Sequence, residues 1–192
     1  MSVRGGTLFS LKMNILFPVL ASILFGSVAA ALVSHFLTSF RADSEYRLRK
    51  LEELYLAVEA SSRDLRLHYH HMLNVAEGTR SWEDAAEKGD ALMIDFQRDH
   101  HTAKMIASIY FPDLVYVVDR MGEVADQLHK TIDSFRAERI EGNDYPAYQS
   151  EFAAASQAVR QRKQEVCEKI VETSKDVRRG WFRTLLRSAT SW

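Results

Sequence analysis

The sequence predicts an all-α protein, with an N-terminal transmembrane helix followed by an antiparallel bundle of about four helices. Residues 14–40 are mostly apolar and carry no charge. In the polar remainder, apolar residues recur at steps of three and four, the period of a helix that packs on one face. The predicted organisation is a short N-terminal segment (1–13), the transmembrane helix (14–40), the bundle (41–177) and a basic tail (178–192).

The stretch from 14 to 40 is long enough to cross a membrane as a helix. No Lys, Arg, Asp or Glu lies between Lys12 and Arg41. About 20 predominantly apolar residues suffice to span the hydrocarbon core of a bilayer. We therefore expect a single-pass membrane protein that contacts lipid through this segment and holds everything after Arg41 on one side of the bilayer.

Two other interpretations of the same stretch stay open. Arg4 and Lys12, followed by an apolar region and small residues near Ala29, also fit a cleaved secretory signal. The apolar pattern continues past that position to Leu37, which favours a retained span. The other alternative is a buried helix of a soluble protein, but a helix of this length in such a core normally shows a polar face.

Small residues fall at every fourth position of the predicted span, at Ser22, Gly26, Ala30 and Ser34. They share one helical face, and small side chains let two helix backbones approach closely in lipid. This packing stripe predicts that the anchor associates with a second copy of the chain or with another membrane protein. The alternative is compositional, because Gly, Ala and Ser are common in membrane helices.

Basic residues flanking the span favour a cytoplasmic C-terminal domain. Two precede the span and four follow it closely: Arg4 and Lys12, then Arg41, Arg47, Arg49 and Lys50. Since the positive-inside rule counts Lys and Arg, the richer side is expected to be cytoplasmic. The predicted location is the bacterial inner membrane. Cys167 is the single cysteine, so no internal disulfide can form.

Residues 41–77 are predicted to form one long polar helix, since they include neither Gly nor Pro. Core-type positions recur along it at alternating steps of three and four, at Leu51, Leu54, Val58, Ser61, Leu65, His68, Met72 and Val75. This heptad seam fits either a parallel coiled coil that continues a dimeric anchor or the core face of a bundle. Gly78 is the expected end of the helix, because Gly readily adopts the left-handed C-cap conformation.

Three further helices are expected in the bundle. The second begins after Ser81 and ends before Pro112, because proline disfavours helix at the residue before it. Asp113 is the expected N-cap of the third helix, whose apolar residues show the clearest helical period in the chain. The last helix begins near Tyr148, after a turn rich in Gly, Asn and Pro, and keeps an apolar face to Val177.

The final segment, 178–192, is basic and contains no acidic residue. Its arginines and first two aromatic residues are Arg178, Arg179, Trp181, Phe182, Arg183 and Arg187. On a helix they partly segregate into a basic and an apolar face, which suits contact with the surface of an anionic membrane. The alternative is that the aromatic residues cap the bundle core while the arginines stay in water.

Histidines are the only candidates for chemistry. Asp64, His68 and His71 lie close together on the first polar helix and could contribute to a metal site inside a bundle. The paired Glu-x-x-His pattern of di-iron bundles is absent, and the consecutive His100 and His101 are not expected to face one site. We therefore predict no metal and no cofactor. A buried His68 could instead sense pH, because protonation would weaken its packing.

No catalytic signature is recognisable, since the sequence has no phosphate-binding Gly loop, G-x-S-x-G, H-E-x-x-H or C-x-x-C motif. The formal net charge of −1 gives no reason to expect a nucleic-acid partner. We predict a non-enzymatic, membrane-anchored helical-bundle protein that acts in protein interaction or assembly and self-associates through the anchor and the seam. The alternatives are a membrane-tethered sensor domain that responds to ligand, metal or pH, and a metal-dependent bundle enzyme.

Overall fold

In the residues that it describes, the computed structural model has four long helices and no strand, which confirms the predicted all-α class. α1 spans Gly6–Ala76, α2 Trp82–Tyr110, α3 Val115–Glu141 and α4 Pro146–Thr190, and a short 3₁₀ helix, η1 (Pro112–Leu114), precedes α3. The backbone is described for residues 6–141 and 146–190, and side chains for 27, 28, 30–138 and 147–180. The chain divides into two compact units, Met1–Glu45 and Tyr46–Trp192.

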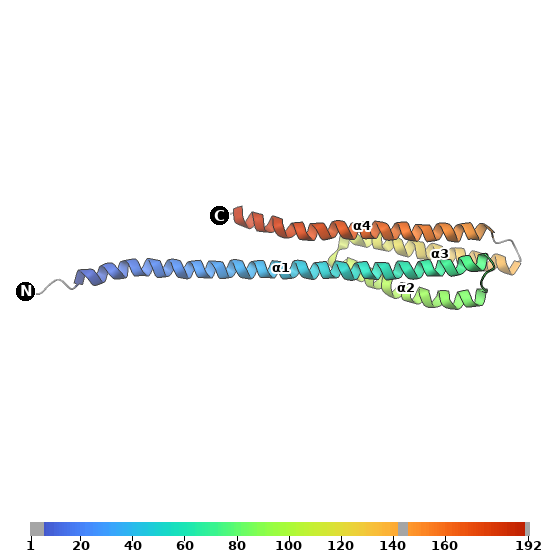
Figure 1. Ribbon diagram of the computed structural model, residues 1–192, viewed down its shortest axis with the longest axis horizontal. Helices are drawn as coiled ribbons and strands as arrows, with labels where there is room; N and C mark the ends of the chain where they lie inside the picture. Colours follow the sequence, from blue (N-terminus) through green and yellow to red (C-terminus); the bar gives the residue numbers. More distant parts are fainter. Residues whose placement is uncertain (1–5, 142–145, 191–192) are drawn as a thin grey trace, which may run out of the picture. The chain divides into compact units, whose positions relative to one another are not determined.

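In the second unit, the last part of α1 packs with α2, α3 and α4 into a helical bundle (Figure 1). α1 and α4 are antiparallel neighbours. Lys163 Nζ of α4 lies 2.7 Å from Glu59 Oε1 of α1. Near the other end of the pair, Gln149 Nε2 donates a hydrogen bond of 3.1 Å to the carbonyl of Ala76. The residue numbers therefore rise along one helix as they fall along the other.

α3 is antiparallel to both α2 and α4. Near its start, Asp119 lies 2.8 Å from Lys104 of α2, and Arg120 lies 3.0 Å from Glu165 of α4. Near its end, the ring of Phe135 meets aromatic rings at the beginning of α2 and of α4. The four helices therefore run up, down, up and down, as short connections require.

The heptad seam forms the core face of α1 within the chain's own bundle. All eight of its positions are buried: Leu51, Leu54, Val58, Ser61, Leu65, His68, Met72 and Val75. The hydroxyl of Ser61 donates to the carbonyl of Val58 at 3.1 Å, so this buried polar group is satisfied. A coiled coil between two copies through this seam would require the bundle to open first.

α1 ends where the sequence predicts. Gly78 has φ = 72°, the left-handed conformation that glycine adopts without steric cost. The Gly78 amide donates to the carbonyl of Val75 at 3.0 Å, and the Thr79 amide to that of Asn74 at 2.9 Å. This pair of hydrogen bonds is the Schellman motif, which satisfies the last carbonyls of the helix.

The start of α2 is as predicted, but the start of α3 is not. Ser81 is the N-cap of α2, and its side chain accepts a hydrogen bond of 3.3 Å from the amide of Asp84. The expectation that Asp113 caps α3 is wrong. Pro112 instead opens the 3₁₀ turn η1, whose N-cap is Phe111 without a side-chain hydrogen bond. Asp113 lies inside that turn because proline fits the first position of a helical turn.

Aromatic rings fill the core where α3 meets α4. The Phe135 ring centroid lies 5.0 Å from that of Tyr148 and 5.6 Å from that of Phe152. Tyr69 of α1 closes the cluster, and its hydroxyl donates to the carbonyl of Val124 at 3.2 Å. Such offset and edge-on ring pairs add to the free energy gained from burial alone.

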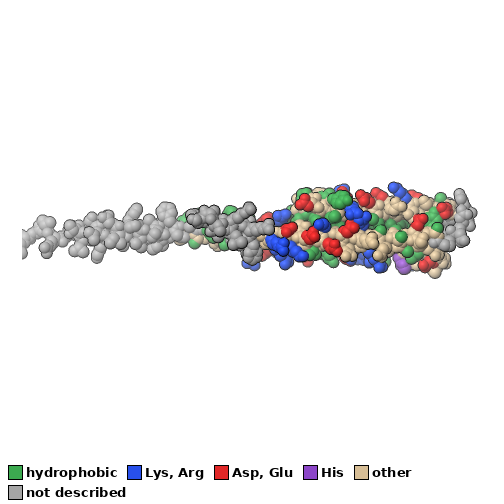
Figure 2. Space-filling model, turned by 90° about the horizontal axis from the view of Figure 1, so that it is seen from above, with side chains coloured by type: hydrophobic (Ala, Val, Ile, Leu, Met, Phe, Trp, Pro, Cys, Tyr) green, Lys and Arg blue, Asp and Glu red, His purple; other side chains and the backbone are tan. Residues whose placement is uncertain are grey.

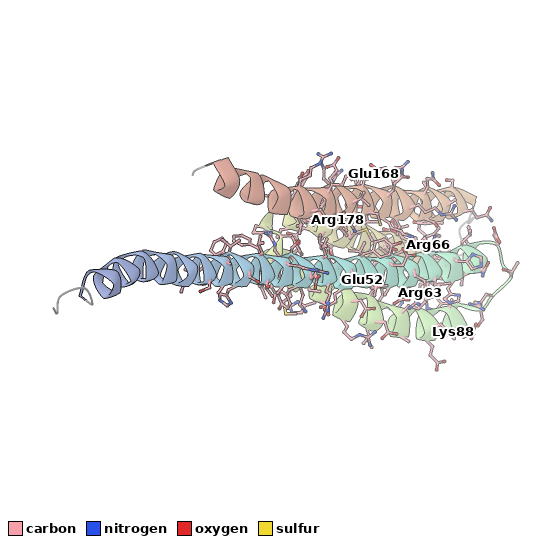
Figure 3. All side chains as sticks on the ribbon, turned by 60° about the vertical axis from the view of Figure 1, so that its left-hand side comes forward. Glu52, Arg63, Arg66, Lys88, Glu168 and Arg178 are labelled. Carbon is pink, nitrogen blue, oxygen red and sulfur yellow. The ribbon has the colours of Figure 1, made fainter. Side chains whose placement is uncertain are left out.

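α4 continues through Val177 without a break and ends at Thr190, so the helix includes most of the predicted basic tail. Acidic and basic side chains are interspersed over the bundle surface in Figure 2. Exposed charged residues such as Glu52, Lys88 and Glu168 lie on the outside of the bundle in Figure 3. Cys167 on α4 is half-buried and free.

Candidate functional site

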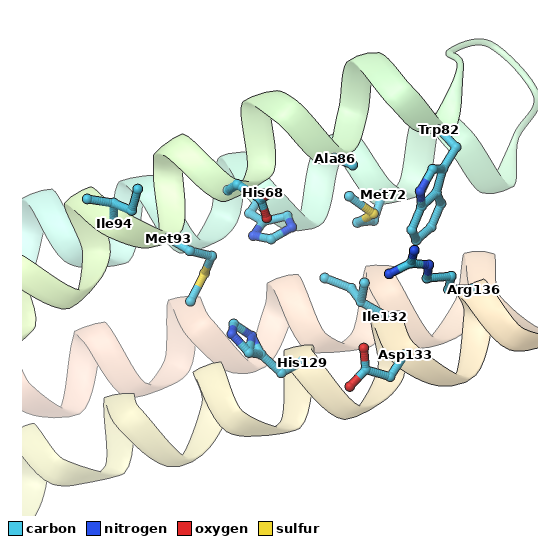
Figure 4. A pocket seen from close by; sticks show the side chains of 11 residues that line it. His68, Met72, Trp82, Ala86, Met93, Ile94, His129, Ile132, Asp133 and Arg136 are labelled. Carbon is cyan, nitrogen blue, oxygen red and sulfur yellow. The ribbon is translucent and has the colours of Figure 1, made fainter.

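A groove of about 590 Å³ lies between α2 and α3, with α1 behind it. Its side chains converge from three helices, as Figure 4 shows. They are His68 and Met72 from α1; Trp82, Ala86, Asp90, Met93 and Ile94 from α2; and His129, Ile132, Asp133 and Arg136 from α3. We call this the His68 groove.

His68 lies between α1 and the backbone of α2. Its residue surface is only 4% exposed. A Cβ atom added at Gly89 would come within 2.5 Å of His68 Nε2, closer than any packed atom tolerates. Gly89 is therefore the position that leaves room for the imidazole. Sequence reasoning does not reveal this pairing, because a glycine inside a helical pattern signals only a local loss of helix propensity.

Burial keeps the imidazole of His68 neutral near pH 7. Desolvation is the main cause that lowers its pKa, to about 4, with a further contribution from nearby His129 and an opposing one from Asp90. The Nδ1 atom is buried and has no hydrogen-bond partner within the described part of the chain. An unpaired buried polar atom costs about 1–3 kcal/mol. The groove thus contains a polar group that its protein surroundings do not satisfy.

A second, smaller groove of about 320 Å³ adjoins the first and shares Met93 and His129 with it. The ring of His100 stacks on Phe96 with centroids 5.4 Å apart and planes inclined by 9°. A Cβ added at Gly122 of α3 would lie 3.1 Å from His100 Nε2, so a glycine again faces an imidazole. Burial also lowers the pKa of His100.

His100 and His101, which were not expected to face one metal site, both line this second groove. Consecutive helical residues point about 100° apart. The two grooves together bring histidines from α1, α2 and α3 to one side of the bundle.

The three candidate metal ligands do not form one site. The carboxylate of Asp64 is buried and accepts a hydrogen bond of 2.9 Å from Arg63 Nε. The ring of His71 is hydrogen-bonded to Arg80 near the start of α2. Only His68 reaches the groove. Among the described residues, no group of three or more His, Cys, Asp or Glu side chains is arranged to hold a metal ion.

About half of the predicted transmembrane helix has side chains outside the described set. Ser22 and Gly26 of the packing stripe are among these residues that lie outside it. The other two stripe positions, Ala30 and Ser34, are exposed on α1. Within the part of the chain that the structure describes, no helix has a stretch long and apolar enough to span a membrane.

The described part of α1 between residues 27 and 40 has two different faces. Its large apolar side chains are all exposed and fall on one half of the helix: Val28, Leu32, Val33, Phe36, Leu37 and Phe40. At about 100° per position, the opposite half carries Ser27, Ala30, Ala31, Ser34 and Thr38, whereas Ser39 falls among the large side chains. The Thr38 hydroxyl donates to the Ser34 carbonyl at 2.8 Å, so its polar group is satisfied within the helix.

The predicted membrane-surface residues are only partly described. Arg178 and Arg179 are exposed on α4. The side chains of Trp181, Phe182, Arg183 and Arg187 lie outside the described set. The structure therefore shows exposed arginines at the start of the basic segment.

Comparison of the chain with protein-family models, with curated proteins and with solved structures gives no match in any of the three.

Proposed function

We propose that this chain is a single-pass membrane-anchored helical-bundle protein that acts in protein interaction or assembly. The observation that carries the proposal is the charge-free stretch between Lys12 and Arg41. Its described part exposes six large apolar side chains on α1, from Val28 to Phe40. Such side chains are stabilised by transfer out of water. Residues 14–40 form a stretch of 27 residues, which is long enough to place them in the hydrocarbon core of a bilayer.

Self-association through the anchor follows from the two faces of the helix. The large side chains suit contact with lipid tails, whereas the stripe of Gly26, Ala30 and Ser34, which runs from the edge of the large half into the small one, suits a second helix. The heptad seam does not take part in this proposal, because the bundle already buries it. Lys and Arg flanking the stretch favour a cytoplasmic bundle, with the basic end of α4 available to anionic lipid.

Membrane fractionation tests the anchor directly. The full chain should stay with membranes after washing with high salt and alkali, and its intact mass should show residues 1–29 retained. A reporter enzyme that works only in the cytoplasm should be active when it is fused after Trp192. Release of the chain by the alkaline wash, or a mature mass that begins near Ala30, would overturn the anchor proposal.

Substitutions on the two faces of α1 test self-association. Gly26→Ile and Ala30→Ile add bulk to the small face and should weaken the signal in a membrane two-hybrid assay. Leu32→Phe adds bulk to the opposite face and is the matched control. Equal signals from all three variants and the unchanged chain would remove the stripe as an interface.

The grooves favour a second candidate, a sensor domain whose bundle responds to ligand or pH. The supporting observation is the unpaired Nδ1 of His68 in a space of about 590 Å³. A binding event there would bridge α2 and α3 and so change how tightly these helices pack. Hydrogen exchange of α2 amides, measured with and without bound ligand, should show slower exchange when the groove is filled. Unchanged exchange in the presence of demonstrated binding would argue against a sensory role.

A further inference from the structure

The size and floor of the His68 groove suit a small organic molecule. Its volume of about 590 Å³ lies inside the range of roughly 300–1,000 Å³ that is typical of small-molecule sites. Met72 and Met93 are buried at its base, and Trp82 and Ile132 are partly buried beside them. Flexible thioethers and an aromatic ring accommodate apolar groups of varied shape. The floor therefore favours a ligand with an apolar or aromatic part.

The polar requirement of the groove comes from His68. Its Nδ1 has no hydrogen-bond partner within the described chain, although only 4% of the residue surface is exposed. Gly89 keeps the space that the ring occupies, so the imidazole is held there by packing. A neutral imidazole offers one donor and one acceptor. A ligand with a hydrogen-bonding group would satisfy the atom that the protein leaves unpaired.

The rim carries charges of both signs. Asp90 of α2 and Asp133 of α3 are exposed carboxylates, and Arg136 is an exposed guanidinium one helical turn beyond Asp133. No salt bridge joins these three side chains to one another within the described residues. A ligand with only a negative charge would be repelled by two carboxylates. A ligand with only a positive charge would be attracted by the two carboxylates but would form no ion pair with Arg136.

From this arrangement we infer that the His68 groove binds a small zwitterion with an apolar body, of which a free amino acid with an apolar or aromatic side chain is the simplest example. The carboxylate of the ligand pairs with Arg136, and its ammonium group lies near Asp90 and Asp133 and donates to the unpaired Nδ1 of His68, on which the charge of Asp90 also acts. The side chain of the ligand packs on the apolar floor. This inference deepens the sensor candidate and rests on groove binding, not on membrane anchoring.

Four related probes separate the contributions of the two charges. The full chain, in detergent or in a nanodisc, is titrated calorimetrically with phenylalanine, N-acetylphenylalanine, phenylalaninamide and N-acetylphenylalaninamide, with leucine as a second zwitterion. These carry both charges, only the negative one, only the positive one, or neither. Phenylalanine or leucine should bind at least tenfold more tightly than any of the three blocked compounds, since a charge-assisted hydrogen bond contributes about 1.5–3 kcal/mol.

Variants assign the binding to the groove. Arg136→Gln should weaken phenylalanine binding about tenfold or more while leaving phenylalaninamide binding unchanged, because only the former has a free carboxylate. Ala86→Trp should block every probe by filling the groove. Arg179→Gln, on the exposed end of α4, is the matched control and should leave all affinities unchanged. Circular dichroism verifies that each variant folds.

Three outcomes overturn the inference: no saturable binding of either zwitterion, binding of a blocked probe as tight as that of phenylalanine, or loss of affinity in Arg179→Gln equal to that in Arg136→Gln. Each concerns the groove alone. Failure of sensing, by contrast, would appear as ligand binding without a change in hydrogen exchange of α2, and failure of the anchor as release from membranes.

Discussion

The two contacts that α3 makes with its antiparallel neighbours differ in how completely they close. Towards α4, Phe135, Tyr148 and Phe152 interlock with ring centroids 5.0 to 5.6 Å apart. Towards α2, the described side chains leave grooves of about 590 and 320 Å³. Both contacts belong to one helix with one clear apolar pattern, and on the α2 side only the end near Phe135 has an aromatic partner among the described side chains, Trp82.

Residue size explains the difference. α4 presents large aromatic side chains to α3, and these fill the space between the helix axes. On the groove side, α2 presents the small side chain of Ala86, while Gly89 of α2 and Gly122 of α3 leave their space to imidazole rings. The imidazoles of His68 and His100 occupy part of that space. A bundle with native packing density in one half can therefore hold a polar hollow in the other.

The largest effect is expected where the contact is closed. Phe135→Ala should reduce the free energy of unfolding by about 3–5 kcal/mol, because it removes a fully buried ring and leaves a cavity. Urea denaturation of the variant and the unchanged protein measures this loss. A loss below about 1 kcal/mol would mean that the aromatic cluster is not the tightly packed part of the bundle.

Protonation of His68 should produce the next largest effect. The pKa is about 4 in the folded state and 6.5 in the unfolded state. Between these values the unfolded chain binds more protons, so stability rises with pH. As pH falls from about 6.5 to 4, His68 should cost about 3 kcal/mol, taking about 1.4 kcal/mol per pKa unit. His71, Asp90 and His129 act on the same ring.

A substituted chain isolates this contribution. Urea midpoints of the unchanged protein and of His68→Gln are compared from pH 7 to pH 4. His100, whose pKa is also lowered, adds a loss of the same sign in both proteins. As pH falls, the urea midpoint of the unchanged protein should decrease more than that of His68→Gln. Equal decreases in the two proteins would show that His68 does not titrate between pH 7 and pH 4.

Filling the glycine positions should have smaller effects that differ between the two grooves. Gly89→Ala places a Cβ within 2.5 Å of His68 and should lose about 1 kcal/mol, since overpacking of about 1–3 kcal/mol exceeds the helix propensity gained. Gly122→Ala meets His100 at 3.1 Å, and this half-buried ring can yield. We expect it to be neutral or slightly stabilising.

A double substitution gives the sharper test of this pair. Shortening the ring in His68→Ala should convert Gly89→Ala from destabilising to stabilising, as measured by a double-mutant cycle from urea denaturation. An unchanged cost of Gly89→Ala in the His68→Ala background would show that the ring does not limit the size of residue 89.

The smallest effect is expected from the ion pair between α1 and α4. Lys163→Met removes the partner of Glu59, but both side chains are partly exposed. Such pairs contribute about 0–1 kcal/mol, and the methionine keeps most of the packing of the lysine stem. Thermal unfolding at low and high salt should give nearly equal losses, whereas a large salt-dependent loss would place this pair among the main determinants of the bundle.

Local rules predicted much of the fold. The seam from Leu51 to Val75 and the end of α1 at Gly78 follow from helical period and from the left-handed preference of glycine. Asp113 was misassigned because proline at position 112 favours a tight 3₁₀ turn over a side-chain cap. Whether the seam would face a second copy or the chain's own helices depends on tertiary packing, which the pattern alone leaves open.

The candidate site was much less predictable. Its residues come from three helices, and the contact of Gly89 with His68 depends on the relative rotation of α1 and α2. Trp82, Asp133 and Arg136 had no distinguishing pattern in the sequence. The sequence shows several histidines, and it shows Gly89 and Gly122 inside otherwise regular helices, but neither observation indicates a groove or which imidazole is buried.

The half-buried thiol on α4 gives the molecule a built-in reporter. Cys167 is the sole cysteine of the chain, and burial raises its pKa, which keeps the reactive thiolate scarce at neutral pH. Alkylation by a maleimide should therefore be slow while α4 stays docked and should accelerate whenever that helix lifts away. The rate of labelling therefore reports local opening of α4, and the measurement needs no engineered cysteine.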